Sequence, residues 1–341
     1  MRQYPIGIAC LTAALLAAAI SSVLFAQPAQ PAPLAAAAAA LSAGEADKAL
    51  ALLQSPPASG PDAAQAHNLI CRVRFTLEQF DAAATACEQA VRLDPQNSND
   101  HLWLGRALGE RAARASFLTA FGLAKRTRAE FEEAVRLDPR NVEALTSLGE
   151  FYRQAPGVVG GGVDKAQQIA AQLDKVDPAS AHELRGKIAE QQKNFAAAES
   201  EYKQEIAAGP HPAFGWNALA GFYLRRQRYA EMESAMHSVL TTVAHDRRGV
   251  VALYDAAGLL IDANRDPTLA ATMLDEYLKS PSKTEEAPAF IAHLRLARLK
   301  QQLGDPASAA RERAAALALA HEYKPTQDFR PPDATPQQAR Y

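Results

Sequence analysis

Two near-identical stretches place the strongest constraint on this chain of 341 residues. One reads CEQAVRLDPQN and contains Pro95, and the other reads FEEAVRLDPRN and contains Pro139, 44 residues further on. A repeating unit of about 34 residues, with an insertion of about ten residues in one copy, accounts for this spacing. A period of this length is typical of an array of small helical units, in which each unit buries its apolar face by stacking on its neighbours.

The residues around these copies follow a regular order of small and large side chains. With Pro95 at position 32 of the unit, positions 8 and 24 are Cys71 and Cys87, and positions 20 and 27 are Ala83 and Ala90. Later units repeat the order with Gly105, Phe131, Ala134, Pro139, Gly149, Tyr152, Gly186, Ala198, Tyr202, Ala220 and Tyr223. This pattern resembles the tetratricopeptide repeat.

The resemblance implies an all-α fold, a right-handed superhelical solenoid of about eight antiparallel helix pairs over residues 34–323. Small residues at positions 8, 20 and 27 let the two helices of a pair approach closely, and larger apolar residues fill the space between them. The first helix of each pair lines the concave face. Because stacked units add along one direction, we expect an elongated array.

Three segments lie outside the predicted array. Residues 1–26 have one Arg near the start, an uncharged apolar stretch at 6–25 and small residues before a cleavage site at Ala26, which predicts a secretory signal peptide or an N-terminal anchor. Residues 27–33 form a Pro-rich linker, and residues 324–341, with four prolines, form a flexible tail. Cleavage predicts a periplasmic or secreted protein, and retention of residues 6–25 predicts a membrane-anchored one.

Two departures from the regular unit stand out. Residues 108–131 lengthen one helix hairpin and are the most basic part of the chain, and residues 154–166 form an enlarged turn with three consecutive glycines. Residues 100–178 are similar to a subgroup of exported bacterial tetratricopeptide proteins and, more distantly, to the regulator of microtubule dynamics family. This likeness brings no activity with it.

Composition and motifs argue against several function classes. With 36 Lys and Arg against 38 Asp and Glu, the chain lacks the basic excess of a nucleic-acid binder. The glycine turn has Val163 and Asp164 where a phosphate-binding loop needs Lys and Ser or Thr. Four histidines share position 4 of their repeats, which predicts packing roles and no metal site: His67, His101, His182 and His293. We expect no enzyme activity and no cofactor.

Two cysteines of the array occupy one helix hairpin. Cys71 and Cys87 fall at positions 8 and 24 of the same repeat, on facing sides of its two helices. In an exported protein this placement favours a structural disulfide. The alternative is that both are small packing residues at positions where Ala or Gly is common.

The concave positions of the first helices supply the candidate binding site. In this repeat family positions 2, 5, 9 and 12 face the groove, which assigns to it Asn68, Arg72, Arg106, Glu150 and Arg153, with Trp103 beside them. Two arginines at equivalent positions of adjacent repeats predict a basic pocket for a carboxylate. The alternative is that these are solvated charges whose stems cover apolar surface.

The sequence therefore predicts an exported, non-enzymatic scaffold that binds a protein or peptide in its concave groove. The expected ligand is an acidic or C-terminal segment of that partner, docked on Arg72 and Arg106 while Asn68 hydrogen-bonds its backbone. The rival interpretation is a membrane-anchored structural or oligomeric envelope component with no peptide ligand.

Overall fold

The computed structural model describes residues 33–57 and 59–330. The predicted signal or anchor and most of the linker lie outside the described residues. Within them the secondary structure is entirely helical: α1 Pro33–Ser42, α2 Ala46–Leu52, α3 Pro61–Thr76, α4 Phe80–Leu93, α5 Ser98–Arg114, α6 Phe117–Leu137, α7 Val142–Gln154, η1 Gly157–Val159, α8 Val163–Leu173, α9 Pro178–Gln191, α10 Phe195–Ala208, α11 Pro212–Arg225, α12 Tyr229–His245, η2 Arg247–Val251, α13 Ala252–Asp262, α14 Pro267–Lys279, α15 Ala289–Gln302, α16 Pro306–Leu319 and α17 Lys324–Asp328.

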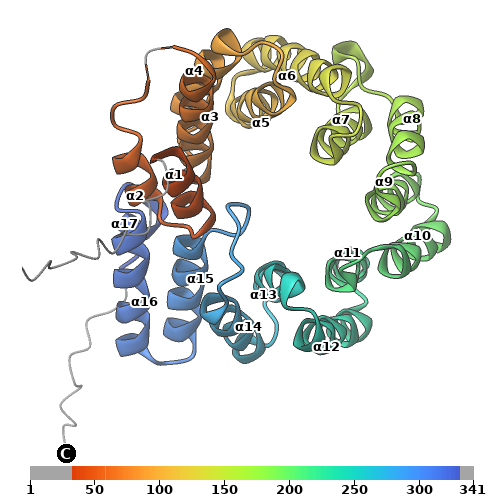
Figure 1. Ribbon diagram of the computed structural model, residues 1–341. Coiled ribbons are helices and arrows are strands. Elements are labelled where there is room, and N and C mark those ends of the chain that lie inside the picture. Colours follow the sequence, from red (N-terminus) through yellow and green to blue (C-terminus); the bar gives the residue numbers. More distant parts are fainter. Residues whose placement is uncertain (1–32, 58, 331–341) are drawn as a thin grey trace, which may run out of the picture. The chain divides into compact units, whose positions relative to one another are not determined.

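Helices α1 to α16 form eight consecutive pairs, and each pair packs on the next along the chain (Figure 1). The predicted all-α, repeat-based fold is confirmed. The odd-numbered helix of most pairs lies on the inner side of the array in this view, and its partner lies on the outer side. The inner helices in this view are α3, α5, α7, α9, α11, α13 and α15.

The repeat sequence fixes where the helices begin. Several helices start with proline at their first turn, where the missing N–H costs no hydrogen bond, and Pro61 and Pro178 are examples. The DPQN copy ends one helix and begins the next. Asn97 of this copy caps α5, because its side chain accepts hydrogen bonds from the backbone N–H groups of Asn99 and Asp100.

Small residues at position 8 allow close contact within a pair. A Cβ on Gly105 of α5 would lie 2.5 Å from the ring of Phe131 of α6, so only glycine fits at this distance. In the preceding pair the same two positions hold Cys71 and Cys87. They are joined by a disulfide with Cα atoms 5.3 Å apart, so a covalent bond replaces the glycine–aromatic contact of the next repeat.

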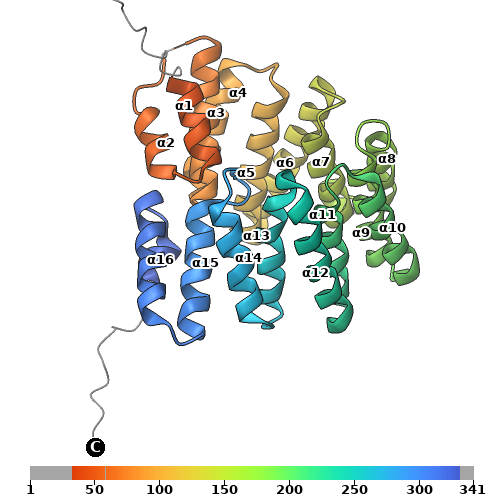
Figure 2. The same ribbon diagram turned by 60° about the horizontal axis from the view of Figure 1, so that its bottom comes forward.

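The last helices pack against the first ones, in a contact that we call the seam (Figures 1 and 2). One apolar cluster contains residues from both ends of the array: Leu41, Leu53, Leu69, Phe290, Leu294 and Tyr323. The rings of Phe290 and Tyr323 meet edge to face, with centroids 4.9 Å apart. Burial of these side chains stabilises the contact through the hydrophobic effect.

Polar contacts and one glycine complete the seam. The Tyr323 hydroxyl donates to Glu78 at 2.8 Å, and the Arg74 guanidinium lies 2.5 Å from the Glu322 carboxylate. Gly44, with φ of +75°, turns the chain from α1 to α2, and a Cβ there would lie 2.3 Å from the backbone nitrogen of Ala289. A side chain at this position would therefore separate α1 from α15.

Two sequence expectations need correction. An elongated array with ends apart does not describe residues 33–330, because the apolar surface at the two ends is buried in the seam. The predicted flexible tail begins too early, since Lys324–Asp328 form α17 and Thr326 is fully buried. Arg313 of α16 holds this helix by donating to the backbone carbonyls of Gln327 and Phe329.

The two departures from the regular unit lie where the sequence placed them. The basic insertion lengthens α5 and α6, and its four arginines, Arg111, Arg114, Arg126 and Arg128, form ion pairs with carboxylates. The glycine turn forms η1 and packs on α6. Lys165 donates to the carbonyl of Gly160 in this turn, which supports a structural role for the glycines.

Candidate functional site

A cavity on the inner face, which we call the aromatic cavity, has a volume of about 1060 Å³. Its walls come from α3, α5, α6 and α7 on one side and from α13, the 284–288 segment and α15 on the other. Six aromatic side chains line it: Phe75, Phe80, Trp103, Phe131, Phe151 and Tyr254. Because both ends of the chain contribute walls, this cavity depends on the seam.

Trp103 forms part of the wall of the aromatic cavity. It is 6% exposed and meets the ring of Phe75 edge to face at 5.5 Å. The guanidinium groups of Arg106 and Arg72 lie 4.6 and 5.4 Å from its ring centroid. Cation–π attraction on an aromatic face at these distances holds both arginine heads close to the indole.

The two arginines of the predicted basic pocket already have carboxylate partners. Arg72 makes a bidentate contact with Glu285, with Nη2 at 2.7 Å and Nε at 3.0 Å. Arg106 lies 3.0 Å from Glu143 of the next repeat, whose side chain is largely exposed. The first helices thus bring the two guanidinium groups to one place, and the chain itself supplies a carboxylate to each.

Asn68 lies elsewhere than the sequence placed it. It is 6% exposed, and its Nδ2 donates to Asp100 Oδ1 at 2.7 Å, so its amide links two repeats and is not offered to a ligand. Burial raises the pKa of Asp100 to about 6, although the hydrogen bond from Asn68 acts in the opposite direction. Position 5 of this helix faces the neighbouring first helix, which explains the difference.

Glu150 and Arg153 of α7 bind each other. Arg153 donates to both carboxylate oxygens of Glu150, at 2.7 and 3.0 Å, and Gln154 donates to the same carboxylate. Burial is the largest single effect and opposes ionisation of Glu150, but the contact with Arg153, the charge of Lys187 and the hydrogen bond from Gln154 together outweigh it, so the pKa of Glu150 lies below the usual range. Glu150 lines the aromatic cavity as a neutralised ion pair.

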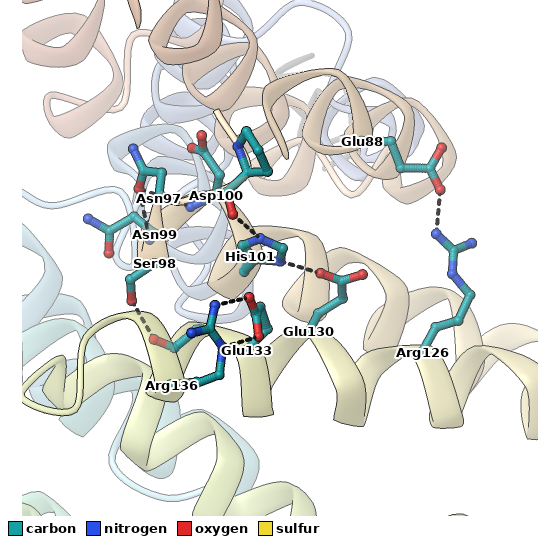
Figure 3. A network of polar contacts seen from close by, with 12 residues as sticks. Glu88, Asn97, Ser98, Asn99, Asp100, His101, Arg126, Glu130, Glu133 and Arg136 are labelled. Carbon is teal, nitrogen blue, oxygen red and sulfur yellow. Dashed lines mark hydrogen bonds and ion pairs between the residues drawn. The ribbon is translucent and has the colours of Figure 1, made fainter. Parts of the chain in front are cut away.

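Three of the four histidines at position 4 pair with a glutamate on the second helix of their own repeat. Figure 3 shows His101 between Glu130, whose Oε2 is 2.6 Å from Nδ1, and the carbonyl of Pro95, 3.2 Å from Nε2. His182 and His293 make the equivalent contacts with Glu201 and Glu312. These contacts join the two helices of a pair, and no cluster of metal-ligating side chains occurs among the described residues.

A second cavity of about 460 Å³, the acidic cavity, lies further along the inner face and is lined by α9, α10, α11, α13 and Arg295 of α15. Glu205 of α10 is 6% exposed, and no hydrogen bond or ion pair reaches its carboxyl group from the described residues. Burial raises the pKa of Glu205 to about 8, with a further contribution from Glu183. Glu205 is not among the site residues predicted from the sequence.

A signal for Glu205 is nevertheless present in the repeat pattern. Counting from the Gly186 register, Glu205 occupies position 27, which is Ala90 and Ala134 in earlier repeats. Position 27 packs against the first helix of the pair, so a carboxylate there is buried at a cost of several kcal/mol in the absence of a partner. A charged residue at a position reserved for alanine therefore marks a candidate functional group.

Comparisons with known proteins match parts of this chain to tetratricopeptide repeat sequences. The family model described as "Tetratricopeptide repeat" matches residues 34–98 and 158–213. Superkiller complex protein 3 from Mus musculus is 29% identical over 121 residues, 33% of this chain, and the chain spans 7% of that relative's length. A thermophilic tetratricopeptide protein of known crystal structure, TTC0263 from Thermus thermophilus, is 24% identical with a TM-score of 0.42, over 58% of this chain and 100% of that one.

Proposed function

We propose that this chain, which is a tetratricopeptide repeat protein, is a non-enzymatic scaffold that binds another protein or peptide on the inner face of its helix array. The aromatic cavity is the observation that carries the proposal. Aromatic side chains in a concave site bury large apolar area at little entropic cost, which is typical of the anchoring part of a protein interface. A volume of about 1060 Å³ has room for several side chains of a partner.

We also propose that the partner presents an acidic or C-terminal carboxylate to Arg72 and Arg106. The contact between Arg72 and Glu285 supports this, because it has the bidentate geometry in which guanidinium groups recognise carboxylates. The side chain of Glu285 belongs to the segment before α15 and lines the same cavity. A partner's carboxylate would therefore enter by exchange with Glu285.

The location that we propose is the periplasm or the exterior of the cell, reached through the signal segment at residues 1–26. The disulfide between Cys71 and Cys87 supports this proposal, since disulfides persist in oxidising compartments. None of the helices within the described ranges combines the length and the apolarity of a membrane span. Mass spectrometry of the natural N-terminus tests the proposal, and a retained residue 6–25 segment would instead favour an anchored envelope component.

Two substitutions with opposite expected effects test the binding proposal. A partner is first captured from an envelope extract with the wild-type chain, and its affinity for purified variants is then measured. Arg72→Ala is expected to weaken binding by tenfold or more, because a charge-assisted hydrogen bond is lost. Glu285→Gln is expected to strengthen binding, because it releases Arg72 from its internal partner.

Arg111→Ala is the matched control, since Arg111 pairs with Asp81 and does not line the aromatic cavity. It should leave the affinity unchanged. If Arg72→Ala and Glu285→Gln both leave the affinity and its salt dependence unchanged, the carboxylate site is wrong. If Trp103→Phe and Phe75→Leu, tested on folded protein, also have no effect, the inner face is not the binding surface.

A further inference from the structure

The carboxyl group of Glu205 is buried, titratable and unpartnered, and it lines the acidic cavity. An unpaired carboxylate in such a place costs several kcal/mol, so folding alone gives no reason to keep it where other repeats have alanine. The charge of Lys187 favours the ionised form of Glu205, but burial outweighs it. Lys187 of α9 lies 2.7 Å from Glu183 on the same helix, and no ion pair joins it to Glu205.

Asn217 of α11 adds a second unpartnered acceptor to the same cavity. It is 8% exposed, and its Nδ2 donates to the carbonyl of Ala252 at 2.7 Å. Because a carbonyl only accepts, the atom that touches it must be the NH₂ group, and the side-chain oxygen is the atom left free. Asn217 Oδ1 is buried and has no hydrogen-bond partner in the described part of the chain.

The remaining charges of the cavity leave a surplus of unpaired carboxylates. Of the cationic groups that line it, Lys187 is held by Glu183, and Arg225 makes a bidentate contact with Glu190. Arg295 stacks over the Tyr254 ring at 4.1 Å and donates to the carbonyl of Tyr254. Three lining carboxylates form no ion pair within the described residues: Glu205, Asp255 and Asp262.

We propose that the acidic cavity binds one basic side chain of the partner, a lysine ammonium or an arginine guanidinium, with Glu205 and Asn217 Oδ1 as its acceptors. Both free atoms accept hydrogen bonds, and both candidate groups only donate. This proposal rests on the proposed function, because the side chain belongs to a peptide on the inner face. Aromatic anchoring in the larger cavity and a basic residue in the smaller one would together fix the position of the peptide.

Binding of the cation is coupled to release of a proton. The charged and polar groups that face Glu205 are Asp177, Glu183 and Lys187 beside or on α9, and Asn217 on α11. At pH 7 the carboxyl group is largely protonated, so it must lose a proton to the solvent before it forms an ion pair with the ligand. Each chain that binds one ammonium or guanidinium group therefore releases close to one proton.

The experiment uses three probes with the purified chain: N-acetyl-lysine amide, N-acetyl-arginine amide and the neutral N-acetyl-norleucine amide. We expect the lysine or the arginine probe to bind at least tenfold more tightly than the norleucine probe, with NMR shifts centred on α10 and α11. The tighter of the two identifies the side chain. Calorimetry in buffers of different ionisation enthalpy should show proton release at pH 7.

Glu205→Gln should reduce the affinity for the charged probe at least tenfold and abolish the proton release. Glu205→Ala serves as a second variant, because alanine already stands at this position in other repeats and should fold there. Glu233→Gln is the control, since Glu233 pairs with Arg265 and does not line the acidic cavity. It should change neither quantity.

Equal binding of the charged and neutral probes, or an unchanged affinity in Glu205→Gln, would overturn the proposal. The result also separates it from the proposed function. A peptide partner could bind the inner face with an affinity that neither Glu205→Gln nor removal of the peptide's own basic residue changes. In that case only the proposal for the acidic cavity is wrong. If the charged probe binds as expected but no peptide partner binds the chain, the proposed scaffold function is wrong, and the acidic cavity is still a site for a basic group.

Discussion

The aromatic cavity and the acidic cavity differ in whether their buried carboxyl groups have partners within the chain. In the aromatic cavity two lining carboxylates are paired within the chain, Glu285 with Arg72 and Glu150 with Arg153, and six aromatic side chains form much of the wall. In the acidic cavity Glu205 is buried and unpaired. One repeat scaffold thus offers an aromatic surface at one place and a buried, titratable carboxyl group without a partner at another.

The largest expected effect concerns the wall of the aromatic cavity. Trp103→Ala should lower the free energy of unfolding by about 4 kcal/mol, because it removes a buried aromatic side chain and the stacking surface of two arginines. Phe214→Ala, at the acidic cavity, should cost less than about 1 kcal/mol, because Phe214 is already 38% exposed. Denaturant unfolding measures both. Equal losses would show that the two cavities do not differ in how their apolar walls are packed.

The next effect depends on pH. The pKa of Glu205 is about 8 in the folded chain against 4.5 for an ordinary glutamate, so the folded state binds the extra proton. The contribution of protonated Glu205 to the free energy of unfolding is fully present below pH 4.5. It is lost as the pH rises through 8. Glu205→Gln should therefore become more stable than wild type as the pH rises above 4.5, by on the order of 3 kcal/mol at pH 7.

Glu150→Gln is the matched variant for this pH effect, because the wild-type Glu150 carboxylate forms an ion pair in the aromatic cavity. It should become less stable than wild type at neutral pH, since the pKa of Glu150 lies below its usual range. Thermal unfolding from pH 4 to pH 9 measures both curves. Curves with the same sign would contradict the difference between the cavities.

The disulfide gives a third prediction, in the repeat that borders the aromatic cavity. Reduction, or Cys71→Ala with Cys87→Ala, should lower the free energy of unfolding by about 2 to 3 kcal/mol, because the bond closes a loop of about 17 residues. Alkylation without reduction, followed by mass spectrometry, should detect no free thiol in protein from the periplasm. Two free thiols would show that both cysteines are packing residues only.

The smallest effect is the coupling energy of the paired arginines. A double-mutant cycle on Arg72 and Glu285 should give about 1 to 2 kcal/mol, because the contact is bidentate and largely shielded from water. The cycle on Arg106 and Glu143 should give no more than about 0.5 kcal/mol, since Glu143 is exposed. Similar values for the two pairs would mean that Glu285 holds Arg72 no more firmly than a surface contact does.

Local patterns predicted the part of the structure that depends on local contacts. The helix pairs follow from the spacing of small residues, and the position of the first helices follows from the repeat register. Arg72 and Arg106 both lie over the ring of Trp103, but a single-repeat pattern does not specify which carboxylate each arginine meets. Glu285 lies 213 residues from Arg72 along the chain.

The seam and the acidic cavity could not be predicted from local patterns, because both depend on contacts between residues that are far apart in the sequence. Tyr323 and Glu78 are 245 residues apart, and their contact depends on the small rotation between repeats added over the whole array. The prediction that Asn68 faces the groove was wrong, because its side-chain amide donates a hydrogen bond to Asp100 of the next repeat. Glu205 alone carried a readable signal, as a charge at an alanine position.

The contact of Gly44 with Ala289 also limits how this protein can change over evolution. An open array gains or loses a helix pair with little penalty, because each new pair only extends one end. Here an added or deleted pair would move α15 away from α1, expose the apolar cluster that they share and remove one wall of the aromatic cavity. The number of repeats is thus tied both to stability and to the proposed binding site, whereas an insertion within a pair, such as the one that lengthens α5 and α6, leaves the seam in place.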